Sequence, residues 1–190
     1  MWNLPNILTI IRIIMIPFII GLLFIDQAWA VWSCLALYAA AAITDYFDGY
    51  FARKMKLSSA FGQFMDPIAD KLLIATLIVA LAGFNRIDDY WLIPAIIIIM
   101  REFMISGLRE FLGPQNIQIP VSKLAKWKTT VQMIALGFLI TGEYGEALVP
   151  YALEIGQWGL AVAAALTVIT GWNYMKVGMQ HIIRMDKEEK

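Results

Sequence analysis

Four aspartates, arranged in two pairs, are the residues of this chain best suited to chemistry. Asp45 and Asp48 stand three residues apart, and Asp66 and Asp70 stand four apart. On a helix, either spacing places both carboxylates of a pair on the same side. The surrounding sequence is strongly apolar, where a carboxylate is costly unless it has a function or a partner. The pattern therefore predicts two helices that meet through acidic side chains.

The helix that carries the first pair has one polar face and one aromatic face. At about 100° per residue, Asp45, Asp48, Gly49, Ala52 and Arg53 share one side. Gly49 and Ala52 remove side-chain bulk, so a ligand or a second helix can approach closely. Arg53 adds a planar set of donors that suits phosphate.

Two such helices, joined by the short polar link 54–59, would bring the four carboxylates together. Four unpaired negative charges repel one another strongly at a membrane boundary, so we expect cations between them. Oxygen ligands suit hard divalent ions such as Mg²⁺ or Mn²⁺. The alternative is a structural ion-pair network, but the single Arg53 cannot neutralise four aspartates.

The composition independently indicates an integral membrane protein. Hydrophobic residues make up 60% of the 190 residues, and the mean hydropathy is +0.67, far outside the range of soluble proteins. With no polar linker or repeat, we expect one membrane domain over 1–190, with an interfacial lead at 1–6 and a charged tail at 184–190. A formal net charge of zero argues against a nucleic-acid partner. The single cysteine, Cys34, excludes an internal disulfide.

We expect an all-α fold with six transmembrane helices and a metal site that faces the cytoplasm. The expected spans are 7–25, 30–53, 62–84, 90–112, a fifth ending near 142, and 157–179 after an interfacial stretch at 147–155. Lysines and arginines gather between spans two and three, between four and five, and after six, whereas acidic residues dominate the other side. The positive-inside rule then places both termini and the carboxylates in the cytoplasm.

The eight fixed residues between Asp45 and Asp70 form the pattern D-x2-D-G-x2-A-R-x8-G-x3-D-x3-D. This pattern resembles the signature of the CDP-alcohol phosphatidyltransferase family at every fixed position. The resemblance implies a membrane enzyme with six transmembrane helices and two catalytic metal ions, Mg²⁺ or Mn²⁺. Members of the family move a phosphatidyl-type group from a CDP-linked donor to an alcohol.

Carried onto this sequence, the resemblance implies that Asp45 and Asp66 bridge both metal ions, with Asp48 completing one site and Asp70 the other. It also implies that Asp70 is the catalytic base for the attacking alcohol. CDP-diacylglycerol is the implied donor. The residues expected to bind it are Asn6, Thr9, Gly49, Ala52, Arg53, Ser59 and Gly62.

Arg12 is the only charged residue within the first apolar span. Snorkelling to the interface would explain it, as would contact with a ligand or a carboxylate. The run N-L-P-N-I-L-T-I-I-R, which ends at Arg12, resembles the opening of the bacterial phosphatidylglycerophosphate synthase branch, whose first helix borders the nucleotide. We therefore expect Arg12 to make a contact.

The acceptor is predicted from a second group of cations, Arg101, Arg109, Lys126 and Lys128. The positive-inside rule accounts for a cation such as Lys123, which lies between two spans, but not for Arg101, which lies within an apolar segment. Convergent arginines and lysines would bind a phosphorylated alcohol. The runs R-E-F-x4-L-R-E and S-K-x2-K-x-K-T-x2-Q resemble the same synthase branch, which implies sn-glycerol 3-phosphate as the acceptor and the bacterial inner membrane as the location.

Two kinds of alternative stay open at this point. One is another member of the family, such as a phosphatidylserine, phosphatidylinositol-phosphate or cardiolipin synthase. The other is a divalent-cation transporter, since intramembrane carboxylates also mark ion paths. Clustering of the acids at one membrane face argues against a transporter. The sequence does not decide whether two copies form a homodimer.

Overall fold

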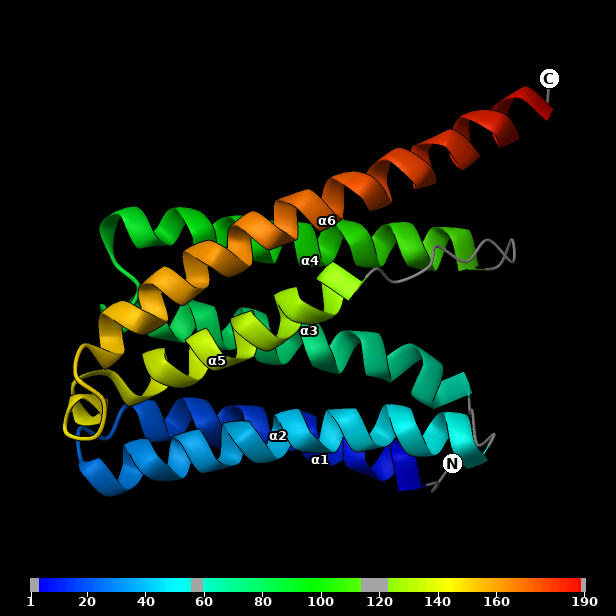
Figure 1. The fold of residues 1–190 in the computed structure, drawn as a ribbon. Coiled ribbons are helices and arrows are strands. Elements are labelled where there is room, and N and C mark those ends of the chain that lie inside the picture. The colour runs from blue at the N-terminus through cyan, green and yellow to red at the C-terminus, as the bar shows by residue number, and fades with distance from the viewer. Residues whose placement is uncertain (1–3, 56–59, 114–122, 189–190) are drawn as a thin grey trace.

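The computed structural model describes the backbone of residues 4–55, 60–113 and 123–188. Side chains are described in the same ranges except at 4, 5, 45–55, 60, 63, 123, 186 and 188. Within these ranges the chain is helical and contains no strand (Figure 1). The elements are α1 (Leu4–Leu23), α2 (Ala28–Met55), α3 (Ala60–Gly83), the short 3-10 helix η1 (Asp89–Trp91), α4 (Leu92–Leu112), α5 (Lys123–Glu146) and α6 (Ala152–Glu188).

The long apolar runs form helices because a helix satisfies its own backbone hydrogen bonds, as a membrane interior requires. Three helical stretches of the described chain are long and apolar enough to cross a membrane: Asn6–Leu23, Asp89–Leu112 and Ala152–Met185. The apolar part of α2 with described side chains, Ala28–Thr44, is shorter. The protein is therefore an all-helical membrane protein, and each of the six expected spans coincides with a helix.

The helix boundaries differ most from expectation at the C-terminus. A single helix runs from Ala152 to Glu188, so it includes the end of the expected interfacial stretch and most of the expected charged tail. The tail is rich in lysine and glutamate, which are good helix formers, and no proline interrupts it. Near the predicted end of the fifth span, α5 is kinked, because Gly142 leaves the helical conformation with a φ of 49°, and the helix then continues to Glu146.

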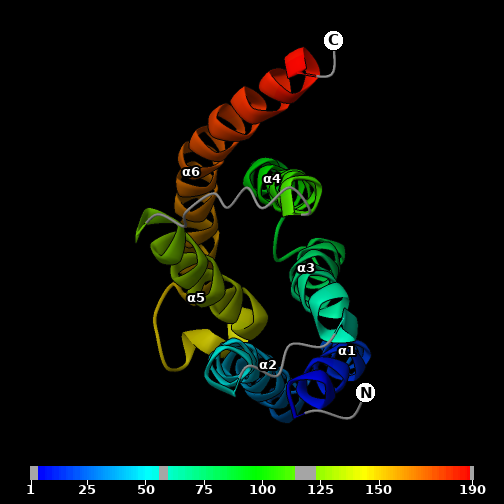
Figure 2. The same ribbon diagram turned by 90° about the vertical axis from the view of Figure 1, so that its right-hand side faces the viewer.

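The six long helices close a ring. Neighbours around it are α1, α2, α5, α6, α4 and α3, and α3 packs again on α1. Figure 2 shows the helices nearly end-on in this order. Segments that are far apart in sequence, such as α2 and α5, therefore become walls of one interior.

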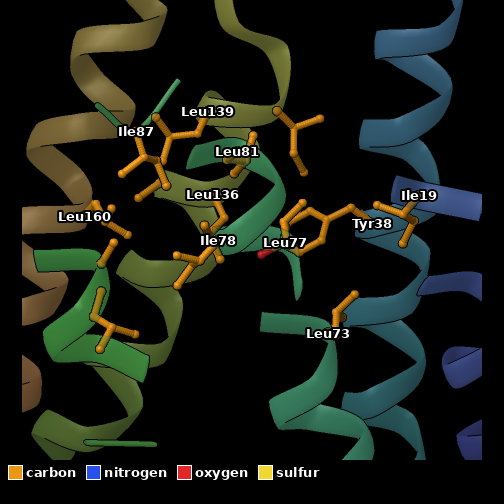
Figure 3. Packing of buried hydrophobic residues seen from close by; sticks show 14 of the residues in the cluster. Ile19, Tyr38, Leu73, Leu77, Ile78, Leu81, Ile87, Leu136, Leu139 and Leu160 are labelled. Atoms are coloured by element: carbon orange, nitrogen blue, oxygen red, sulfur yellow. The ribbon is translucent and has the colours of Figure 1, made fainter. Parts of the chain in front are cut away.

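The apolar core fills the end of the ring near the α1–α2, α3–η1 and α5–α6 connections. Leu77 and Leu81 of α3 meet Leu136 and Leu139 of α5, and Tyr38 of α2 lies against the same cluster (Figure 3). All five side chains are buried. The charged side chains that line the cavity described below, on α1, α3, α4 and α5, lie toward the opposite end of these helices.

Close approach of α5 and α6 depends on two glycines. A Cβ at Gly156 would lie 2.9 Å from Cγ of Leu139 and 3.0 Å from its backbone nitrogen. A Cβ at Gly159 would lie 2.9 Å from Cβ of Ala135. Small residues allow membrane helices to pack at short distance, which supplies most of their association energy.

Gly156→Ala should therefore destabilise the protein by about 1–3 kcal/mol, since the new methyl group meets backbone that cannot yield. The thermal midpoint in detergent measures the effect. Gly107→Ala is the matched control, because a Cβ there meets nothing within 4 Å and alanine favours helix. Equal midpoints for the two variants would contradict the role given to Gly156.

Candidate active site

Two hydrogen bonds join the first helix to the carboxylates of α3. Thr9 donates through Oγ1 to Oδ1 of Asp66 at 2.6 Å. The Arg12 guanidinium donates to Oδ1 of Asp70 at 2.7 Å. Thr9 and Arg12 are about one turn apart on α1, as Asp66 and Asp70 are on α3. The two hydrogen bonds therefore join α1 to α3 at two successive helical turns. The expected contact of Arg12 with a carboxylate is confirmed.

The two members of the Arg12–Asp70 pair differ in exposure. The Arg12 side chain is 1% exposed, whereas the Asp70 side chain is 50% exposed. A buried guanidinium is costly without a charged partner, so Asp70 stabilises Arg12 where it lies. Asp70 nevertheless keeps half of its surface accessible for a further contact.

Two of the residues expected to bind the donor lie nearer the N-terminal ends of α1 and α3 than Thr9 and Asp66 do. Asn6 is 2% exposed and precedes Thr9 by three residues on α1. Gly62 is buried and precedes Asp66 by four residues on α3. Because α1 and α3 make their contacts in parallel register, both lie one turn beyond the Thr9–Asp66 contact, toward the end of the ring opposite the apolar core.

The first carboxylate pair lies on α2, which continues to Met55. Asp45 and Asp48 are thus three residues apart on one helix, as predicted. The side chains of 45–55, and all of Ser59, lie outside the described residues. The metal-binding and donor-binding roles of Asp45, Asp48, Gly49, Ala52, Arg53 and Ser59 accordingly stay predictions. The described side chains alone contain no group of three or more potential metal ligands.

The second cation group surrounds a single carboxylate on α4. Lys128 of α5 donates from Nζ to Oε1 of Glu102 and is buried. The Arg101 guanidinium lies 3.5 Å from the same oxygen. One glutamate thus faces two cations, and it leaves the group with net positive charge.

Side chains of α6 accept hydrogen bonds from the two arginines of α4. Arg101 donates to Oγ1 of Thr170 at 3.2 Å, and Arg109 donates to the Tyr174 hydroxyl at 2.9 Å. The Arg109 guanidinium also lies 4.9 Å from the centre of the Tyr174 ring, a favourable cation–π distance. Thr170 and Tyr174 are four residues apart, so one face of α6 fixes both guanidinium groups.

A cavity of about 280 Å³ opens between α1, α2, α3, α4 and α5. Its charged and polar lining residues are Arg12, Asp70, Lys71, Arg101, Glu102, Arg109, Lys128, Thr129 and Gln132. These comprise five cations and two carboxylates. A second cavity of about 380 Å³ lies between α3 and α4 and adds two carboxylates, Asp66 and Glu110, to the lining. The two cavities are adjacent, because they share the lining residues Asp70, Lys71, Arg101, Glu102 and Arg109.

Most of the expected acceptor-binding residues meet at these cavities. Arg101, Arg109 and Lys128 line the first one. Lys126 is exposed and is not among the residues that line either cavity. The two lysines are two residues apart, about 200° around the helix, so they face opposite ways.

Four residues of this site were not expected. Glu102 and Gln132 belong to the sequence patterns of the fourth and fifth segments, and their polarity next to apolar sequence was the available signal. Thr170 and Tyr174 of α6 carried no signal, since their partners lie 69 and 65 residues away in the chain.

The sequence of the chain matches a known protein family over most of its length. Residues 2–169 match the CDP-alcohol phosphatidyltransferase family. The chain belongs to this family, whose members are generally dependent on divalent metal ions. The transporter alternative is therefore set aside.

Three relatives share one curated name, CDP-diacylglycerol–glycerol-3-phosphate 3-phosphatidyltransferase. The protein from Rickettsia typhi is 47% identical and covers 93% of this chain and 97% of its own. The Cereibacter sphaeroides protein is 36% identical over 100% of this chain and 99% of its own. The Salmonella choleraesuis protein is 36% identical over 92% of each.

The Arg12–Asp70 pair predicts non-additive effects on stability. Arg12→Met and Asp70→Ala should each lower the thermal midpoint in detergent, because each leaves the other charge without this partner. The double variant should lose less than the sum, with a coupling of about 1–3 kcal/mol. Strictly additive losses would show that the contact contributes nothing to the fold.

Proposed function

We propose that this protein transfers the phosphatidyl group of CDP-diacylglycerol to sn-glycerol 3-phosphate, giving phosphatidylglycerophosphate and CMP. The family match and the names of the relatives support this reaction. The observation that carries it is the cavity, where the half-exposed carboxylate of Asp70 shares one space with Arg101, Arg109 and Lys128. A phosphorylated alcohol fits such a site, because its hydroxyl can give its proton to the carboxylate and its phosphate can bind to the cations.

The carboxylates fit a divalent-metal site by chemistry, since Asp66 and Asp70 supply only oxygen ligands on one face of α3. Asp45, Asp48, Asp66 and Asp70 would hold two Mg²⁺ or Mn²⁺ ions. When bound, the ions supply positive charge that neutralises the phosphates of the donor and its leaving group.

The donor would lie along the polar face of α2 and the starts of α1 and α3. Gly49 and Ala52 leave room for the pyrophosphate, and Arg53 donates to its oxygens. Asn6 and Thr9 would contact the cytidine, with Ser59 and Gly62 completing the donor site. Thr9 already donates to Asp66, so it ties the nucleotide end to the carboxylates.

Asp70 would accept the proton of the C1 hydroxyl of the acceptor. As that proton moves to the carboxylate, the hydroxyl oxygen forms a bond to the β-phosphorus of the donor. The bond from that phosphorus to the oxygen of CMP breaks, and CMP leaves with the electron pair. Arg12 would keep Asp70 oriented during this step through their 2.7 Å hydrogen bond.

The acceptor phosphate would bind to Arg101, Arg109 and Lys128, whose charges exceed that of Glu102. Arginine guanidinium groups held by Thr170 and Tyr174 are already oriented, so little freedom is lost on binding. Lys126, exposed on the same helix as Lys128, would contribute at the approach to the site.

The proposed topology has six spans with both termini in the cytoplasm of a bacterium. Helices α2, α3 and α5 contain 28, 24 and 24 residues. At about 1.5 Å per residue, each is long enough for a bilayer core of about 30 Å. The basic connections then lie on the inner side, where a water-soluble nucleotide is available.

The role of Asp70 as base predicts that Asp70→Asn releases almost no CMP, because an amide cannot take the proton of the hydroxyl. The variant should stay folded, because the amide oxygen can still accept a hydrogen bond from Arg12. Asp66→Asn should also raise the metal concentration needed for half-maximal rate. CMP release and the thermal midpoint are measured on the same preparations. Near-normal turnover of Asp70→Asn would refute the base assignment.

The cation group predicts a strong preference for a phosphorylated acceptor. With CDP-diacylglycerol as donor, kcat/KM for sn-glycerol 3-phosphate should exceed that for glycerol by roughly a hundredfold or more, since a neutral alcohol leaves the excess positive charge of the cation group uncompensated. Serine and inositol should be poor as well.

Lys128→Met should reduce this preference, whereas Lys187→Met, which changes an exposed cation far along α6, should leave it unchanged. Equal rates with glycerol and glycerol 3-phosphate would contradict the assignment of the cations. A preference for serine would place the protein in another branch of the family.

A further inference from the structure

Gln132 lies in the cavity that joins the base to the phosphate-binding cations. It follows Lys128 by four residues on α5, so both side chains share one face of that helix. Only 3% of Gln132 is exposed, and it lines the same cavity as Asp70 and Lys128. An acceptor that fills this cavity and contacts both Asp70 and the cations would therefore also face the Gln132 amide.

Within the part of the chain that the structure describes, the side-chain carbonyl of Gln132 has no hydrogen-bond donor. Its Oε1 is buried and finds no partner among the residues that the structure describes. Several other side chains that line the cavity are apolar: Ala41, Ala42, Leu73, Ile74 and Met133. A buried acceptor without a donor is costly, and an apolar side chain of the same size would avoid that cost. A bound ligand that carries a donor would satisfy it.

The proposed acceptor has one hydroxyl that the reaction itself does not use. Its phosphate, held by the cations, offers acceptor oxygens, and its C1 hydroxyl gives its proton to Asp70. The C2 hydroxyl lies on the carbon between these two ends and is free to donate. Given the proposed function, we infer that Gln132 accepts a hydrogen bond from the C2 hydroxyl and thereby selects a three-carbon acceptor that bears it.

This contact would separate sn-glycerol 3-phosphate from two near analogues. 3-Hydroxypropyl phosphate keeps the phosphate and the attacking hydroxyl but has no C2 hydroxyl. Dihydroxyacetone phosphate carries a carbonyl at C2, so two acceptor oxygens would face each other. A site that hydrogen-bonds a hydroxyl rejects an analogue without it because its own buried polar atom is left unpaired.

The test compares both acceptors in wild-type protein and in Gln132→Met, with saturating CDP-diacylglycerol. Wild-type kcat/KM should favour sn-glycerol 3-phosphate over 3-hydroxypropyl phosphate by at least about tenfold, the effect of one buried hydrogen bond. Gln132→Met should bring the ratio close to one while it still turns over 3-hydroxypropyl phosphate. That retained activity also shows that the variant folds.

Gln157→Met is the matched control. Gln157 is a second buried glutamine, but it lies on α6 and donates to the backbone oxygen of Arg86 at 3.3 Å, away from the cavity. This variant should keep the wild-type acceptor ratio even where its stability falls.

The outcomes separate the inference from the proposed function. Failure of wild-type protein to use sn-glycerol 3-phosphate at all would refute the function. Use of it with an unchanged ratio in Gln132→Met, both acceptors being slowed equally, would show that Gln132 holds a water or supports packing, and would overturn the inference. If Gln132→Met is inactive with both acceptors, the wild-type protein alone decides. Equal kcat/KM of wild-type protein for sn-glycerol 3-phosphate and 3-hydroxypropyl phosphate would then overturn the inference.

Discussion

The ion pair between buried Arg12 and half-exposed Asp70 is the interaction on which the rest of the site depends. A guanidinium that is 1% exposed inside an apolar ring is tolerable only with an anionic partner. The pair fixes the register of α1 against α3, and the same register brings Thr9 to Asp66. The nucleotide end of the proposed donor site is thereby placed beside Asp66 and Asp70, the carboxylates proposed to bind metal.

The ring divides its interior between packing and charge. Leucines of α3 and α5 fill one end, where close approach of α5 and α6 at Gly156 tightens the core. At the other end α1 to α5 line the cavity, and α6 supports its wall through Thr170 and Tyr174. Apolar packing thus supplies a frame for the charged side chains, among which the five cations of the cavity outnumber its two carboxylates.

Local spacing in the sequence was sufficient to predict the helices and the pairing of Asp66 with Asp70 on one face, whereas the contact of Arg12 was expected from the family resemblance of the first helix. It could not choose between Lys126 and Lys128, since the side of α5 that faces inward is set by packing against α2 and α6. The support of Arg109 by Tyr174 links residues 65 apart, for which no local pattern exists. That the Gln132 carbonyl finds no partner among the described residues could be learned only from the assembled cavity.

Asp70 and the cations proposed to bind the acceptor phosphate line one cavity. In the proposed reaction, the acceptor hydroxyl therefore attacks the β-phosphorus of the donor directly, and no group of the protein becomes bonded to phosphorus. The stereochemistry at that phosphorus is the most direct test. CDP-diacylglycerol made chiral there with oxygen isotopes should give phosphatidylglycerophosphate of inverted configuration. Retention would mean two successive displacements through a phosphatidylated side chain, and would contradict direct transfer within this cavity.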